Sequence, residues 1–177
     1  MDVTGTVLAF NGRLGEWYAL AAKRSGVALS ASPEGIEHAF KQAYKETCAA
    51  HPCFGADDMA TRDWWRTCVL RSFELADCDF TKDLSPTDAD RLFQKVYSLF
   101  GSHKTYRAFP DAAPFLKWAR ARGIVTGVVS NADERYQDDI VCARMRACAG
   151  PCCCLHPAPF AGVRAACLTR TGPRLRV

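Results

Sequence analysis

Two short segments of the sequence carry polar residues whose types suit phosphoryl transfer. The first is Asp2-Val3-Thr4-Gly5-Thr6, and the second is Ser130-Asn131, which closes an apolar run. The carboxylate of Asp2 can bind a cation or attack an electrophilic phosphorus atom. Ser130 offers a hydroxyl and a backbone N–H at the expected start of a helix, where the helix dipole favours an anion. A carboxylate, a cation and an anion site together indicate phosphoryl transfer.

Each segment also has a purely structural interpretation. Asp2 could be a turn residue, because Gly5 tolerates backbone angles that other residues avoid. Ser130 could cap the helix that follows it, a role that is compatible with phosphate binding. In an open α/β sheet, however, ligands bind beyond the carboxyl ends of the strands. Two motifs at strand ends are therefore predicted to face one crevice.

The residues between the two motifs predict a small helical bundle over residues 12–105. Apolar residues recur at helical spacing in four stretches, and no strand pattern separates them. Ser32-Pro33 and Ser85-Pro86 are typical helix starts, and Gly26 is a typical helix end. The four helices are expected to begin near Leu14, Pro33, Thr61 and Pro86. Large aromatic residues at core spacing are assigned to packing rather than to substrate selection: Trp64, Trp65, Phe73 and Tyr97.

The pattern changes to alternating helix and strand after Tyr106. A helix is predicted over residues 111–122, closed by Gly123, and it leads into the nearly continuous apolar run of residues 124–130. Such a run is typical of a strand buried in a parallel sheet. A further helix is expected from residues 131–133 to about residue 140, since Asn131 and Asp133 are natural N-caps. These elements predict an α/β architecture.

Residues 2–140 resemble the haloacid dehalogenase-like hydrolase superfamily. The resemblance rests on the D-x-T-G-T motif, the helical insert that follows it, and the strand that ends in Ser-Asn. It implies that Asp2 is the nucleophile and a Mg²⁺ ligand, and that the backbone carbonyl of Thr4 is a further metal ligand. Ser130 and Asn131 would bind the transferred phosphoryl group. The implied substrate is a small phosphorylated compound, which would react through an aspartyl-phosphate.

The resemblance also implies a domain organisation. An incomplete Rossmann-like parallel-sheet core would comprise residues 1–11 and 106–140, and a helical-bundle cap would be inserted over residues 12–105. Only Met1 precedes Asp2, where a central strand is expected. We therefore expect a shortened or alternatively spliced chain, with residues 141–177 as a divergent tail.

Two departures from the family pattern predict little activity. Thr4 stands where family phosphatases usually carry an Asp that protonates the leaving group, and a hydroxyl is not a useful acid near neutral pH. The family's later Lys and acidic metal ligands have no counterpart in residues 141–177, which contain no Lys, Asp or Glu. We expect weak or absent Mg²⁺ binding. The alternative function is a non-catalytic product or an interaction module based on the helical cap.

The tail differs in composition from the rest of the chain. It holds six of the ten cysteines and six Arg, so it is more basic than the whole chain, whose net charge is +4. Neither structural period is sustained there, and four Pro argue against long elements, so the tail is expected to be disordered. Its cysteines lack the paired spacing of a zinc site, and Arg without aromatic platforms does not indicate nucleic-acid binding. A zinc site is therefore the less favoured interpretation of the candidate ligands Cys148, Cys152, Cys153, Cys154 and His156.

Length and composition bound the class of protein. A chain of 177 residues allows one full domain or a small domain with an insertion, and it excludes a large multidomain enzyme. Hydrophobic residues make up 49% and charged residues 24%, which is the balance of a globular chain. No apolar run approaches the roughly 18 residues of a membrane span, and no secretory signal is recognisable. We expect an intracellular, most simply cytoplasmic, protein without a membrane partner.

Overall fold

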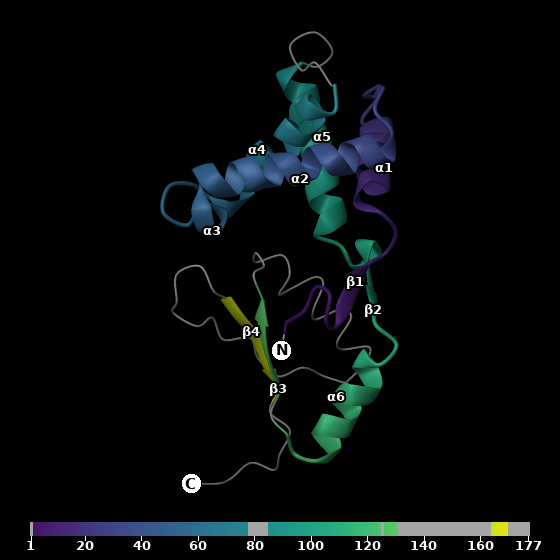
Figure 1. Cartoon of the computed structure of the whole chain (residues 1–177), viewed down its shortest axis with the longest axis vertical. Coiled ribbons are helices and arrows are strands. Elements are labelled where there is room, and N and C mark those ends of the chain that lie inside the picture. Colours follow the sequence, from purple (N-terminus) through teal and green to yellow (C-terminus); the bar gives the residue numbers. More distant parts are fainter. Residues whose placement is uncertain (1, 78–84, 125, 131–163, 170–177) are drawn as a thin grey trace. The chain divides into compact units, whose positions relative to one another are not determined.

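The computed structural model describes residues 2–77, 85–124, 126–130 and 164–169 of the chain (Figure 1). The chain divides into two compact units. One is the helical unit, Gly12–Phe100, and the other combines Met1–Asn11 with Gly101–Val177. The helical unit ends at Phe100 rather than at residue 105. The next residues, His103–Thr105, form a 3-10 turn that leads directly into a strand.

The helical unit contains the four predicted helices and one short additional helix. The predicted helix starts are confirmed, and at the start of α2 the hydroxyl of Ser32 accepts a hydrogen bond from the N–H of Gly35 at 3.2 Å. The unpredicted helix α3 contains Cys53 and Phe54 in the left-handed region, with φ of 52° and 58°. Residues other than glycine rarely adopt this backbone conformation, so the sequence gives no signal for it. The helices are α1 (Leu14–Arg24), α2 (Pro33–Ala50), α3 (Pro52–Gly55), α4 (Thr61–Leu75) and α5 (Pro86–Phe100).

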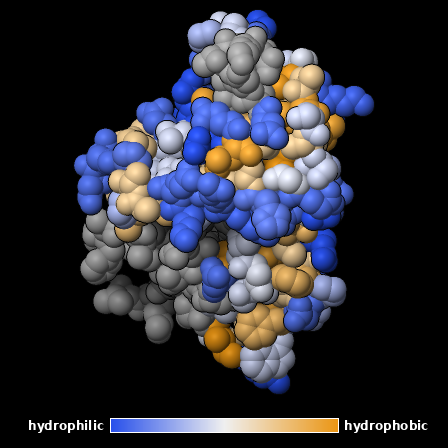
Figure 2. Space-filling model, turned by 45° about the horizontal axis from the view of Figure 1, so that its top comes forward, coloured by the Kyte–Doolittle hydropathy of each residue, from blue (hydrophilic) through white to orange (hydrophobic). Residues whose placement is uncertain are grey.

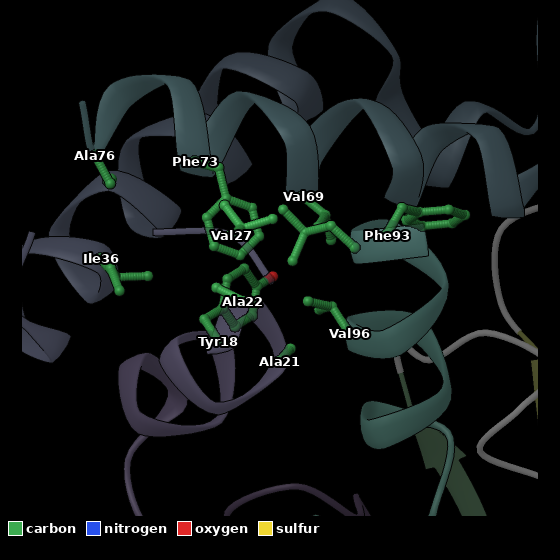
Figure 3. Packing of buried hydrophobic residues seen from close by; sticks show 12 residues of the cluster. Tyr18, Ala21, Ala22, Val27, Ile36, Val69, Phe73, Ala76, Phe93 and Val96 are labelled. Carbon is green, nitrogen blue, oxygen red and sulfur yellow. The ribbon is translucent and has the colours of Figure 1, made fainter. Parts of the chain in front are cut away.

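The core of the helical unit forms where α1, α2, α4 and α5 converge. Figure 3 shows Tyr18 of α1, Phe73 of α4 and Val96 of α5 pointing toward one another. The rings of Tyr18 and Phe73 lie 5.4 Å apart. The predicted packing roles are confirmed, because Trp64 and Phe73 are fully buried and two further aromatic side chains pack partly buried against the core, Trp65 and Tyr97.

The second unit begins with an antiparallel strand pair. Strand β1 (Leu8–Phe10) pairs with β2 (Tyr106–Ala108), so that Leu8 lies opposite Ala108 and Phe10 opposite Tyr106. These strands belong to residues on either side of the helical unit. The helical unit is therefore inserted between two paired strands. Helix α6 (Ala112–Ala121) follows β2 and buries Ala112 and Leu116 in a small cluster with Val3, Val7, Leu8 and Tyr106.

A second strand pair corrects the sequence-based prediction for the apolar run and includes the described part of the tail. Strand β3 (Thr126–Ser130) pairs antiparallel with β4 (Arg164–Thr169), with an irregularity between Gly127 and Val128. The apolar run was predicted to join a parallel sheet, and the tail was predicted to be disordered. Both ladders in the described part of the chain are antiparallel, and part of the tail is a strand. Apolar composition indicates burial of a strand but does not fix the direction of its neighbour.

Two further expectations concern the helix at residues 131–140 and membrane-spanning segments. The helix predicted over residues 131–140 lies outside the described residues. None of the described helices combines the length and apolar character needed to cross a bilayer.

Candidate functional site

Asp2 lies at the start of a tightly hydrogen-bonded turn. Its Oδ1 accepts the N–H of Val3 at 2.7 Å. The carbonyl of Val3 in turn accepts three backbone N–H groups, at 3.2, 2.8 and 2.9 Å, from Thr6, Val7 and Leu8. The side chains of Val3 and Val7 are buried, whereas that of Asp2 is exposed. The buried side chains of Val3 and Val7 thus anchor the turn, while the carboxylate of Asp2 faces solvent.

Thr4 and Gly5 form the tip of the same turn. Gly5 adopts a φ of +84°, which favours glycine, and its N–H donates to the carbonyl of Leu8 at 2.8 Å. Thr4 is exposed and forms an isolated parallel bridge with Leu8. The predicted motif is therefore a turn that places Asp2 and Thr4 two residues apart on the surface, and β1 begins only after it.

The second predicted segment belongs to a different strand pair. Ser130 is the last residue of β3, and its ladder partner is Arg164 of β4. Asn131 lies outside the described residues. The structure thus joins Asp2 and Thr4 in one turn and places the backbone of Ser130 at the end of another strand.

The Asp2 turn supplies only a few of the oxygen ligands that a magnesium ion needs. Mg²⁺ requires near-octahedral oxygen ligation, usually with one or two carboxylates and several waters or phosphate oxygens. The turn supplies one carboxylate, and one of its oxygens already accepts the Val3 N–H. Throughout the described ranges no three His, Cys, Asp or Glu side chains gather as a metal site would need. The implied metal would have to be held mainly by Asp2, the carbonyl of Thr4 and water.

A buried cluster between α2 and α4 was not recognised in the sequence. Burial raises the pKa of the Cys68 thiol to about 12, and the nearby Cys48 acts in the same direction. Burial, followed by Cys48, also raises the pKa of Tyr44 to about 12. Both groups stay protonated near neutral pH, so neither is an activated nucleophile or base. Tyr44 and Cys48 are four residues apart on α2, and this helical spacing was the available signal.

A contact between a histidine ring and a carboxylate fixes the loop that follows α2. The Nδ1 of His51 lies 2.5 Å from Oδ2 of Asp58, and the carbonyl of His51 accepts the indole N–H of Trp64 at 2.8 Å. These contacts hold the segment that contains the left-handed residues of α3. They account for its conformation by packing and hydrogen bonding, and they assemble no catalytic group.

Comparisons with known proteins agree with the motif. Residues 1–160 match the family model for haloacid dehalogenase-like hydrolases, a range that extends beyond the change in composition at residue 140. Proteins named haloacid dehalogenase-like hydrolase domain-containing protein 3 are similar: the Mus musculus protein is 33% identical over 138 residues, the Homo sapiens protein 31% over 137, and the Danio rerio protein 33% over 137.

Each of these alignments covers 77% of this chain and 52%, 52% and 54% of the respective relative. The chain therefore spans about half the length of the relatives that it matches. The family model covers most of the chain, and such a match is sufficient to assign the chain to a family. The chain belongs to the haloacid dehalogenase-like hydrolase family.

Proposed function

We propose that this chain carries the nucleophile of a phosphatase-type hydrolase that acts on a small phosphorylated compound. The observation that supports the proposal most directly is the exposed carboxylate of Asp2 on an anchored turn, in a chain of a hydrolase family. Oδ1 of Asp2 accepts the Val3 N–H, so Oδ2 is the oxygen available for attack.

The proposed reaction has two steps. Oδ2 of Asp2 forms a bond to phosphorus while the bond from phosphorus to the leaving oxygen breaks, and the leaving oxygen takes a proton from water. Water then hydrolyses the aspartyl-phosphate and releases inorganic phosphate, which restores the carboxylate. Ser130 and Asn131 are proposed to bind the phosphoryl oxygens. Family members generally use Mg²⁺, which supplies charge neutralisation at the phosphate when it is bound.

The chain's own residues argue for slow turnover. Thr4 lacks an acidic proton near neutral pH, so proton transfer to the leaving group falls to solvent. A positioned general acid typically contributes about 10²–10⁴-fold to a rate, and the chain forgoes that factor at this position. The turn supplies one carboxylate, that of Asp2, and we therefore propose that its affinity for Mg²⁺ is low.

The test uses the complete purified chain and a chromogenic phosphate ester. Hydrolysis is measured with Mg²⁺ and with a chelator, for the parent chain, for Asp2→Asn and for Asp57→Asn. Asp57 is an exposed carboxylate of the helical unit, so its variant makes the same chemical change away from the turn. We expect slow, Mg²⁺-dependent hydrolysis that Asp2→Asn abolishes and Asp57→Asn retains. Equal rates for the parent and Asp2→Asn would contradict the proposal.

The alternative proposal is a non-catalytic interaction module built on the helical unit. It is favoured by the self-contained core of that unit and by the lack of an acidic partner for Asp2 within the turn. A cooperative thermal transition without Asp2-dependent hydrolysis would support it. A cooperative transition together with such hydrolysis would exclude it.

A further inference from the structure

Helix α6 exposes a large apolar surface. Three of the four exposed large hydrophobic side chains in the described part of the chain lie on α6 or just after it: Phe115, Trp118 and Ile124, at 50%, 46% and 41% exposure. The rings of Phe115 and Trp118 stack, with centroids 6.0 Å apart and planes at 23°. Figure 2 shows hydrophobic and pale side chains together at the bottom of the view, and Figure 1 shows α6 there. A neighbouring face of α6, formed by Ala112, Leu116 and Ala119, is already buried in its own unit.

Opposite charges flank the two aromatic residues on the same stripe of the helix. Asp111, Phe115, Trp118 and Arg122 are separated by four, three and four residues, which is the spacing of one helical face. Asp111 has helical backbone angles, φ −85° and ψ −15°, and its carboxylate does not cap the helix. The guanidinium carbon of Arg122 lies 4.5 Å from the centre of the Trp118 ring. We call these four residues the α6 stripe.

The α6 stripe is complementary to a second copy of itself. When two such helices lie antiparallel about a two-fold axis midway between Phe115 and Trp118, each Asp111 faces an Arg122, and each Phe115 faces a Trp118. The match follows from the symmetric four-three-four spacing. An interface in which one patch binds its own copy is the commonest arrangement in protein dimers. We propose that the α6 stripe is a two-fold interface between two copies of this chain.

The charges of the stripe favour a second copy over other occupants. An acidic peptide or an anionic bilayer would be attracted by Arg122 but repelled by Asp111. A nucleic-acid base needs a free ring face for stacking, whereas Trp118 already contacts Phe115 and Arg122. Within the described residues neither Asp111 nor Arg122 forms an ion pair. A second copy satisfies both charges and covers both rings.

Self-association is expected to be weak and reversible. Four side chains on one helix bury less than the roughly 800 Å² per partner of a standard interface. The test is sedimentation equilibrium of the complete chain over a wide concentration range at low salt, in a reducing agent so that the ten cysteines form no intermolecular disulfides. We expect a monomer–dimer equilibrium.

Charge reversal provides the decisive comparison. Asp111→Arg places two cations opposite each other, and Arg122→Asp places two carboxylates opposite each other, so each variant alone should dimerise at least about tenfold more weakly. An equimolar mixture of the two should form heterodimers, because every facing pair is then opposite in charge. The double variant Asp111→Arg/Arg122→Asp should dimerise like the parent chain.

Lys117→Asp is the matched control. Lys117 is an exposed residue of α6 outside the stripe, and this change alters the charge by the same amount as Arg122→Asp. It should leave dimerisation within about twofold of the parent, since isolated surface charges contribute little. Circular dichroism verifies that each variant is folded. A parent chain that stays monomeric, an Asp111→Arg or Arg122→Asp single variant that dimerises like the parent, or an equimolar mixture of these two variants that stays monomeric would each overturn the proposal.

Discussion

Cys68 is a buried thiol whose surroundings link the stability of the helical unit to pH. Burial raises its pKa from 9.0 to about 12, whereas the unfolded chain releases this proton near 9.0. Between these values the folded state binds more protons than the unfolded state, so the free energy of unfolding falls as the pH rises. Tyr44 acts in the same direction, because burial raises its pKa from 10.0 to about 12.

The prediction is that Cys68→Ala weakens this alkaline loss of stability. At a pH below 9.0 the variant should be less stable than the parent by about 1 kcal/mol, which is typical of a point variant. Between 9.0 and 12 the difference should shrink or reverse, because the alanine has no proton to lose. Urea midpoints measured by circular dichroism across this range test it. Cys53→Ala, at an exposed thiol, is the control, and an equal flattening there would contradict the argument.

At the candidate site, the local conformation was predictable from the sequence, whereas a shared crevice for Asp2 and Ser130 stays a prediction. The turn at Gly5 and the exposure of Asp2 follow from a short motif, because glycine permits the left-handed conformation and an unpaired carboxylate prefers water. The joining of Asp2 and Ser130 into one site depends on how two distant strands are placed. A motif of a few residues carries no information about that placement.

At the scale of elements, the packing of α1 on α2 depends on a glycine. Gly15 is buried, and a Cβ at this position would lie 1.8 Å from the carbonyl oxygen of Pro33. A backbone carbonyl cannot avoid the added methyl group by changing a rotamer, so α1 and α2 must separate. We predict that Gly15→Ala lowers the free energy of unfolding by about 1–3 kcal/mol, the usual cost of overpacking. Urea unfolding followed by circular dichroism measures it.

Gly35→Ala is the matched control for that experiment. Its Cβ would meet nothing closer than 3.7 Å, so the change adds a methyl group without a clash. Because alanine is the better helix former, this variant should be neutral or more stable by up to about 1 kcal/mol. Similar losses in the two variants would show that the contact with Pro33 is not the cause.

The helices were predictable because their ends carry local chemistry. Ser32 accepts the Gly35 N–H at 3.2 Å and Pro33 takes the first helical position, as the dipeptide indicated. The strands were less predictable, since β1 and β2 contain three residues each and exist through their pairing. The antiparallel partner of β3 begins at Arg164, 34 residues beyond Ser130, and its composition gave no alternating pattern.

At the scale of the whole chain, the paired strands β1 and β2 flank the helical unit in the sequence. The N–H of Asn11 donates to the carbonyl of Thr105 at 2.8 Å, and its side-chain amide donates to the carbonyl of Lys104 at 3.2 Å. The chain therefore leaves and re-enters the second unit at neighbouring points. An insertion with adjacent ends can fold without constraining the unit that carries it.

The last prediction is that residues 12–100 fold when they are produced alone. Every residue of the main helical core, from Tyr18 to Val96, lies within this range, so excision removes none of these contacts. We expect a helical circular-dichroism spectrum and a cooperative thermal transition. Phe73→Ala in the fragment tests whether this core is the cause, because removing a fully buried phenyl ring should cost about 3–5 kcal/mol. A fragment that melts without a cooperative transition would mean that the helical unit needs residues outside 12–100 to fold.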